Sequence, residues 1–199
     1  MAKLFLRAVE VKDVPLITKW FNDTDTVKFM STVVRCQLHT HESIKEQIRM
    51  SDPDFERLFM VCLDDRPEPI GHAGLDELDF YDKRGELFLM IGEKSERGKG
   101  YGLQIVNLLL DFAFNELKLN SVFATVTCIN NQSMKAMEKA GFTKIGIRRE
   151  FNFIEGKFWD EVFYDITLMD YLALKTVPTK PAIIEKNKNY STVGICCSG

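Results

Sequence analysis

The chain of 199 residues lacks several features that would direct it to special environments. Its 26 basic and 29 acidic residues give a net charge of −3, so the basic excess that accompanies nucleic-acid binding is missing. No apolar run approaches the roughly 20 residues of a membrane-spanning helix. The N-terminus is too short and too quickly charged to resemble a secretory signal. We therefore expect a cytoplasmic protein with neither a nucleic-acid nor a membrane partner.

Cysteines are few and form no recognisable site. There are five of them, an odd number, and their spacing matches no zinc motif. Cys62 and Cys128 lie within apolar segments, which is typical of buried, reduced thiols. Cys196 stands fourth from the end, but its neighbours do not fit a prenylation box. We expect no metal and no lipid anchor.

The pattern of apolar residues predicts one α/β domain with a mixed sheet and helices on both faces. Strands are expected at 4–9, 57–63, 69–78, 87–91, 121–127, 142–154 and 158–171, and helices from Asp13 onward and at 41–50, 100–117 and 132–140. The uninterrupted apolar run at 87–91 is typical of a central strand buried on both faces. We assign residues 1–172 to the domain. Residues 173–199 contain prolines and no periodicity, so we expect a poorly ordered C-terminal extension.

A glycine-rich loop precedes the longest predicted helix. Gly98, Gly100 and Gly102 alternate there, and glycine lets a backbone approach a ligand closely. Free N–H groups and the dipole at a helix start favour an anion, and Arg97 and Lys99 add positive charge. The loop therefore predicts a pyrophosphate cradle, with a flexible turn before a helix as the alternative.

Two other phosphate motifs do not fit this loop. In a Walker loop Lys99 would be followed by Ser or Thr, but Gly100 follows it. A dinucleotide fingerprint would need glycine at the position of Leu103.

With these residues in view, the chain resembles a known family. The segment Arg97-Gly98-Lys99-Gly100-Tyr101-Gly102 is similar to the acetyl-CoA signature of GNAT N-acetyltransferases. A second block, from Asn130 to Phe142, resembles the family's strand-end Asn, Ser-containing helix and Gly-Phe pair. The resemblance extends from residue 1 to about 172, and it is nearest to the ribosomal-protein N-terminal and spermidine acetyltransferase branches.

The resemblance implies a GNAT fold: a mixed, mostly antiparallel sheet of about seven strands with a splay between its two central strands. Acetyl-CoA would be the co-substrate, and its acetyl group would pass directly to an amine. The backbone of Leu89, Met90 and Ile91 would pair with the pantetheine arm. The amides of Arg97, Gly98, Lys99, Gly100, Tyr101 and Gly102 would hold the pyrophosphate. Asn130 would hydrogen-bond the pantetheine, unless it is simply a turn residue.

Two residues are the candidate catalysts. Many family members protonate the departing thiolate with a tyrosine, but Met137 stands at that position. Ser133, one turn earlier, is the implied substitute; a hydroxyl that caps the helix is the alternative. Glu86 opens the central strand, where it would hold the amine or relay its proton, or be an exposed strand-end charge. Tyr101 and Tyr164 are weaker candidates for the acid.

The acceptor is the least constrained part of the prediction. Acidic residues gather in the segments expected to surround it: Asp23, Asp25, Asp76, Glu77, Asp79, Glu150, Glu155, Asp160 and Glu161. They would attract a cation if they faced a cleft, and are otherwise a solvated face. The acceptor thus stays open between a polyamine, an aminoglycoside-like amine and a protein N-terminus. A homodimer is an expected assembly. An acetyl-CoA-binding sensor or structural module without turnover is the alternative function.

Overall fold

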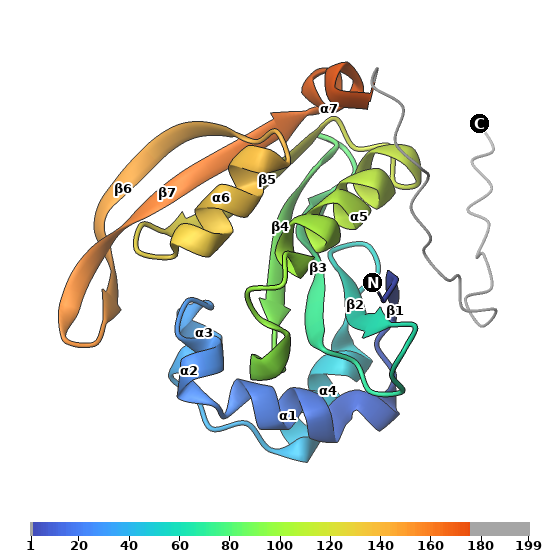
Figure 1. Cartoon of the computed structure of the whole chain (residues 1–199), viewed down its shortest axis with the longest axis vertical. Helices are drawn as coiled ribbons and strands as arrows, with labels where there is room; N and C mark the ends of the chain where they lie inside the picture. Colours follow the sequence, from blue (N-terminus) through green and yellow to red (C-terminus); the bar gives the residue numbers. More distant parts are fainter. Residues whose placement is uncertain (1, 176–199) are drawn as a thin grey trace.

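The computed structural model describes residues 2–175, and Figure 1 shows their arrangement. The expectations for Cys196 and for nearly all of the 173–199 extension lie outside the described residues.

A seven-stranded sheet in the order β1-β2-β3-β4-β5-β7-β6 forms the centre of the domain. Its strands are β1 (Leu4–Ala8), β2 (Arg57–Leu63), β3 (Gly71–Asp79), β4 (Arg84–Ile91), β5 (Ser121–Thr127), β6 (Thr143–Ile154) and β7 (Lys157–Thr167). All neighbours are antiparallel except β4 and β5, which are parallel. The mixed sheet predicted from the apolar pattern is confirmed, and so is its mostly antiparallel character, which the family resemblance implied.

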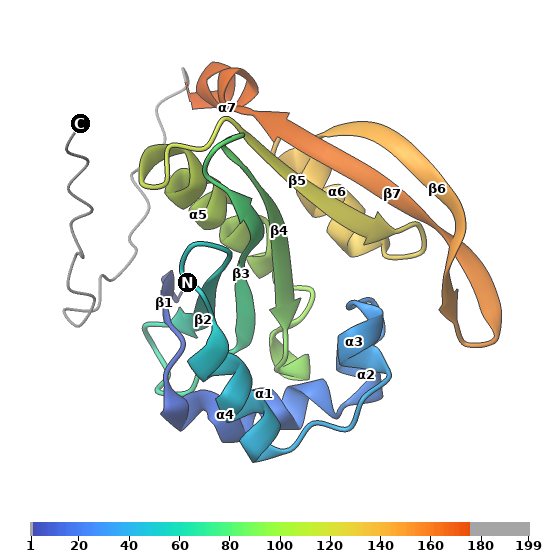
Figure 2. The same ribbon diagram turned by 180° about the vertical axis from the view of Figure 1, so that it is seen from behind.

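Helices cover both faces of this sheet. They are α1 (Val14–Phe21), α2 (Thr24–Val27), α3 (Thr32–Arg35), α4 (His41–Met50), α5 (Tyr101–Asn115), α6 (Asn131–Lys139) and α7 (Leu168–Lys175), with single 3₁₀ turns at Val11–Asp13 and Lys94–Glu96. Figures 1 and 2, seen from opposite sides, place α5 and α4 on opposite faces.

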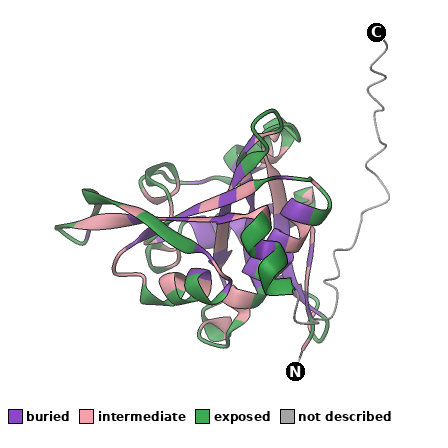
Figure 3. Ribbon diagram, turned by 90° about the horizontal axis from the view of Figure 1, so that it is seen from above, coloured by how far each residue is buried: buried purple, intermediate pink, exposed green. Residues whose placement is uncertain are grey.

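Two apolar clusters follow from the alternation of side chains along the strands. Ala73 and Leu75 of β3 face α5 in the larger cluster, whereas Met60 of β2 and Met90 of β4 face α1 and α4 in the smaller one. Figure 3 shows these buried residues concentrated between the sheet and its helices. The two faces of the sheet are therefore packed against different helices, and each face has its own apolar cluster.

The two central strands separate after a short paired segment. β4 and β5 are in register only at Arg84↔Ser121, Gly85↔Val122 and Glu86↔Phe123, although β4 continues to Ile91 and β5 to Thr127. The ribbons diverge beyond that point (Figure 2). This splay, predicted through the family resemblance, leaves Glu86 at its apex.

Several local predictions were wrong. The helix after β1 starts where predicted, with Asp13 at the N-cap position and Pro15 in the first turn, but the Asp13 side chain does not cap it, because Arg7 holds its carboxylate at 2.7 Å. The segment predicted as one strand at 158–171 ends at Thr167. There Thr167 and Asp170 cap α7, with the hydroxyl of Thr167 donating to Asp170 Oδ2 at 2.6 Å. The short helices α2 and α3 carry too few turns to produce a visible period.

The run at 87–91 is only partly buried, which also corrects the prediction. Leu87 and Met90 are buried, but Phe88, Leu89 and Ile91 keep intermediate exposure. These side chains line a cleft, so the strand is not packed closely on both faces as the sequence predicted.

The hairpin of β6 and β7 turns at Glu155 and Gly156, as predicted. Both residues have positive φ, 50° and 78°, which is typical of a two-residue hairpin turn. The hairpin extends beyond the main body (Figure 1).

Candidate active site

A cleft of about 1140 Å³ lies at the splay of β4 and β5. It brings together most of the residues predicted from the sequence: Glu86, Leu89, Met90, Ile91, Arg97, Gly98, Gly100, Tyr101, Gly102, Asn130 and Ser133. Lys99 is not among its lining residues. The cleft contains both the glycine-rich loop and a group of carboxylates, so it can accommodate an anion and a cation at different points.

The glycine loop has the conformation that its sequence predicts. Gly98 and Gly100 have φ of 75° and 84°, and Gly100 is the N-cap of α5 without any side-chain cap. A Cβ built on either glycine would meet no protein atom within 4 Å. The first N–H groups of a helix have no partner within it. The space in front of the loop is therefore open to a ligand that these amides can bind.

The two cations of the loop are turned toward the protein. Arg97 donates through Nε to the carbonyl of Ile91 at 3.0 Å and through Nη2 to Thr26 Oγ1 at 2.7 Å. Lys99 pairs with Glu96 at 2.9 Å. The backbone amides, with the helix dipole, are thus the main anion-binding groups of the loop.

Packing behind the loop fixes its position. Gly92 lies against the indole of Trp20, where a Cβ would overlap the ring. Trp20 Nε1 donates to Glu93 Oε1 at 2.9 Å, and Lys19 pairs with the same oxygen at 2.8 Å. Helix α1 thereby anchors the end of β4 and the start of the loop.

On the other side of the splay, α6 contributes a cap and a hydroxyl. Asn130 Oδ1 accepts from the N–H of Ser133 at 3.2 Å, so Asn130 is the N-cap of α6. Within the described part of the chain the Ser133 hydroxyl has no hydrogen-bond partner, although it lines the cleft. Its role as a helix cap is therefore taken by Asn130.

Met137 and the two candidate tyrosines, Tyr101 and Tyr164, lie in different environments. Met137 is buried in the core at 4% exposure. Tyr164 is also buried; it donates to Glu138 and does not line the cleft. Its pKa is raised by burial and by Glu138, which makes it a poor acid. Tyr101 lines the cleft.

Glu86 occupies the apex of the splay. Thr125, just beyond the last paired residues of β5, donates through Oγ1 to Glu86 Oε1 at 3.0 Å. Burial raises the pKa of Glu86, and the carboxylates of Glu77 and Glu161 add to this effect against the lowering influence of Thr125. Glu86 is thus a half-buried, oriented carboxylate and not an exposed strand-end charge.

Asp76 lies directly across from Glu86 on β3. Burial raises its pKa to about 7, with further contributions from Glu86, Glu77 and Glu56. The sequence reasoning grouped Asp76 with the other acidic residues and gave it no role of its own. A regular hairpin continued from the pair Asp79↔Arg84 would place Glu77 opposite Glu86, and a register shift between Asp76 and Asp79 brings Asp76 there instead.

The other predicted acidic residues divide into two groups. Asp25 and Glu161 line the cleft, and so does Glu56, which the sequence reasoning missed. Most of the others are engaged outside the cleft: Asp23 caps α2 and pairs with Lys94, Asp79 pairs with Arg84, Glu155 pairs with Lys28, and Asp160 accepts from the N–H of Glu150, while Glu77 lines a different cavity. Asp25 and Glu161 are also paired, with Lys94 at 3.4 Å and with Arg148 at 3.2 Å. Only part of the acidic set therefore acts on the cleft.

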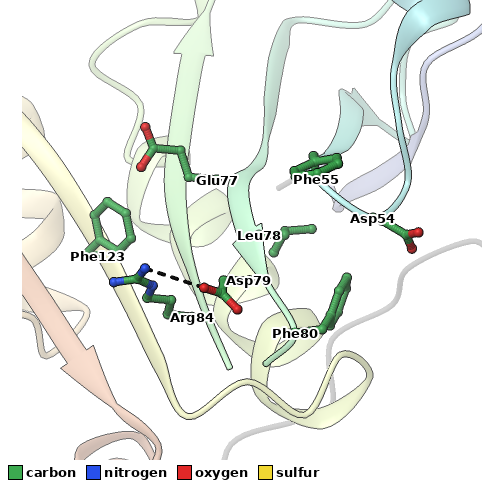
Figure 4. Close-up of a pocket in the computed structure, with 8 residues that line it drawn as sticks. All are labelled: Asp54, Phe55, Glu77, Leu78, Asp79, Phe80, Arg84 and Phe123. Carbon is green, nitrogen blue, oxygen red and sulfur yellow. Dashed lines mark hydrogen bonds and ion pairs between the residues drawn. The ribbon is translucent and has the colours of Figure 1, made fainter. Parts of the chain in front are cut away.

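A second cavity of about 520 Å³ lies where β3, β4 and β5 meet their turns (Figure 4). Asp54, Phe55, Glu77, Leu78, Asp79, Phe80, Arg84 and Phe123 line it. Its cation, Arg84, is paired with Asp79 at 3.4 Å and with Asp82 at 3.7 Å. It contains no residue of the glycine loop, and we place the active site in the larger cleft.

Among the described residues no helix has the length and apolar character to span a membrane. The same residues include no group of three or more His, Cys, Asp or Glu side chains placed to hold a metal ion.

Comparison with known proteins gives a consistent result. Residues 3–143 match the model of the acetyltransferase (GNAT) domain family. The chain is 24% identical over 170 residues to the uncharacterized N-acetyltransferase p20 of Bacillus licheniformis, covering 85% of this chain and 95% of the relative. It is 27% identical over 167 residues to the uncharacterized N-acetyltransferase YnaD of Bacillus subtilis, covering 82% and 93%.

Among solved structures, the fold is similar to spermidine N-acetyltransferase from Vibrio cholerae in complex with CoA and spermine. The TM-score is 0.76 at 24% identity, over 85% of this chain and 98% of that one.

Proposed function

Because this chain belongs to the GNAT acetyltransferase family, we propose that it transfers the acetyl group of acetyl-CoA to a primary amine of a cationic polyamine. The carboxylates at one end of the cleft carry this proposal. Asp76, Glu86 and Glu161 line it together. Glu161 is paired with Arg148 of β6 at 3.2 Å, whereas Asp76 and Glu86 have no ion-pair partner among the described residues. Such a surface attracts and holds a cation.

The donor would bind along the splay. The amides of residues 97–102 would hold the pyrophosphate, with the contribution of Lys99 limited to its backbone. β4 has no strand partner on its β5 side beyond Glu86. The backbone of Leu89, Met90 and Ile91 can therefore pair with the pantetheine amides, and Asn130 lies on the opposite wall. These contacts would direct the thioester to the apex, where Glu86 lies.

Direct transfer needs a neutral amine, a polarised thioester and a proton for the thiolate. Carboxylates at the apex can hold the ammonium group and take its proton. The unpartnered hydroxyl of Ser133 supports a role in protonating the CoA thiolate, and Tyr101 is the second candidate in the cleft.

The acceptor proposal favours a polyamine over a protein N-terminus. Several carboxylates in one cleft match a ligand with several positive charges, whereas an N-terminus presents one. We also propose a cytoplasmic location, because the donor is an intracellular thioester. The homodimer stays a prediction; exposed Ile145 and Ile147 on the edge strand β6 support it.

A panel of amines tests the function. Thiol release from acetyl-CoA is followed with spermidine, with an aminoglycoside and with a short peptide bearing a free N-terminus. We expect kcat/KM to be highest for spermidine and to fall as salt is added, because salt screens charge attraction. A preference for the peptide, unchanged by salt, would move the assignment to N-terminal acetylation.

A further inference from the structure

We propose that Asp76 is a catalytic residue of this site and accepts the proton of the incoming ammonium group, while Glu86 holds that group in place. This inference rests on the proposed function and names the group that carries out its first chemical step.

The sheet register places the two carboxylates side by side. Asp76 and Glu86 are direct partners in the antiparallel pair of β3 and β4, so their side chains lie on the same face. Both line the cleft. Two like charges so close, in a half-buried position, cannot easily both be ionised, and the pair therefore retains a proton to higher pH than either would alone.

Hydrogen bonding gives the two carboxylates different roles. Glu86 Oε1 is engaged by the hydroxyl of Thr125 at 3.0 Å, which favours its ionised form. Asp76 Oδ1 is buried and has no hydrogen-bond partner in the described part of the protein. Asp76 is thus the member of the pair that more readily carries the proton.

The charges around Asp76 act in the same direction. Glu56 approaches it from the segment before β2, Glu77 from β3 and Glu86 from β4, and each raises its pKa. Arg57 is the one cation of the neighbouring strand β2. It donates to the Glu56 carbonyl and lies over the Phe80 ring. With burial as the largest cause, the pKa of Asp76 reaches about 7. A general base is most effective when its pKa lies near the working pH.

A second unpartnered group on the same face points to a ligand. His72, four residues earlier on β3, lines the cleft and is 7% exposed, yet its Nδ1 has no partner among residues 2–175. Burial lowers its pKa to about 4, so it is neutral at pH 7. A neutral imidazole can accept a hydrogen bond from an ammonium group. This face of β3 therefore carries two buried polar atoms without a partner, both on residues that line the cleft.

The proposed step balances as follows. An N–H bond of the ammonium group breaks and its proton passes to the Asp76 carboxylate. The freed lone pair attacks the acetyl carbonyl carbon, so a C–N bond forms and the C–S bond breaks. The CoA thiolate leaves with the bonding electron pair and takes up a proton. The second proton on nitrogen is lost as the amide forms, and Asp76 releases its own proton to water.

The test is the pH dependence of kcat/KM for spermidine in the wild type and in the Asp76→Asn, Glu86→Gln and Asp65→Asn variants. Asp65 is exposed in the turn after β2, so its variant controls for the loss of one carboxylate. We expect an acid limb near pH 7 in the wild type and in Asp65→Asn. Asp76→Asn should lose that limb and fall on the order of a hundredfold at pH 7. In Glu86→Gln the limb should move to lower pH, because the neighbouring like charge is gone.

A titration keeps the proposal testable if a variant does not fold. The carboxyl ¹³C signal of Asp76, in protein labelled at aspartate, should titrate near pH 7 in the wild type and at a lower pH in Glu86→Gln, still above its ordinary value because burial remains. Retention of the wild-type rate and limb by Asp76→Asn, or titration of Asp76 near pH 4 in the wild type, would overturn the inference. Absence of thiol release by the wild type with every amine would instead reject the proposed function.

Discussion

Arg97 donates to Thr26 Oγ1 at 2.7 Å and so joins the glycine loop to helix α2, 71 residues earlier in the chain. The guanidinium also reaches the carbonyl of Ile91 at 3.0 Å, at the end of β4. In this position Arg97 links the glycine loop both to the end of the central strand β4 and to helix α2.

The hydrogen bond between Arg97 and Thr26 should affect donor binding. Thr26→Val keeps the shape of the side chain but removes the hydrogen-bond acceptor. One such bond contributes about 1 kcal/mol, so the Kd for CoA should rise by about fivefold. Isothermal titration calorimetry measures the change. Thr24→Val on the same helix is the control, since Thr24 is exposed. Equal affinity in both variants would mean that the bond does not position the loop.

Gly100 should tolerate a side chain in the free protein but not in the complex. Its φ of 84° makes any substitution strained, by about 1–2 kcal/mol, although no protein atom lies within 4 Å of the added Cβ. Gly100→Val should therefore fold and should lose more than tenfold in CoA affinity. Gly156→Val, at φ 78° and also in open space, carries the same strain in the β6–β7 turn. If the two variants bind CoA equally well, the loop is not the cradle.

Ser133→Ala should separate catalysis from binding. The hydroxyl makes no hydrogen bond within residues 2–175 and does not cap α6, so the variant should fold normally. We expect kcat to fall by about tenfold or more, because proton transfer to the leaving group is slowed, with CoA affinity near that of the wild type. Ser51→Ala, after α4, controls for the substitution. A loss confined to CoA affinity would make Ser133 a ligand of the donor and leave Tyr101 as the acid.

His72 should make the protein sensitive to acid. Burial lowers its pKa from the ordinary value of 6.5 to about 4 in the folded state, so between these two pH values the unfolded chain binds a proton that the folded chain does not bind. The stability that the neutral histidine retains above pH 6.5 is lost as the pH falls toward 4, by up to about 3 kcal/mol. Urea unfolding should show the difference between wild type and His72→Gln shrinking by this amount across that range. A constant difference would mean that the pKa of His72 is the same in the folded and unfolded states.

The sequence predicted the elements whose signals are local and repeated. Strands at 57–63 and 121–127 and the helix at 41–50 have the predicted bounds, because each carries its own apolar pattern. The glycine loop was predicted for the same reason, since the conformation of Gly98 and Gly100 is a property of the residues themselves.

What the sequence did not reveal depends on partners distant in the chain. Asp76 gains its character from Glu86 across the sheet and from burial, neither of which its neighbours in sequence indicate. Arg97 was predicted to add positive charge to the loop, but its contacts with Ile91 and Thr26 exist only in the folded chain and could not be read from the sequence. The start of α7 was missed because the cap formed by Thr167 and Asp170 follows directly on a strand-like run.

The central claim is that this cleft acetylates a polycationic amine. Its most direct test is to incubate the protein with acetyl-CoA and spermidine, and to compare the thiol released with the acetylated spermidine detected by mass spectrometry. The account predicts equal amounts of the two products, accumulating over many turnovers. Tight binding of acetyl-CoA without thiol release, with spermidine and with every other amine tried, would contradict it and identify a binding module in place of an enzyme.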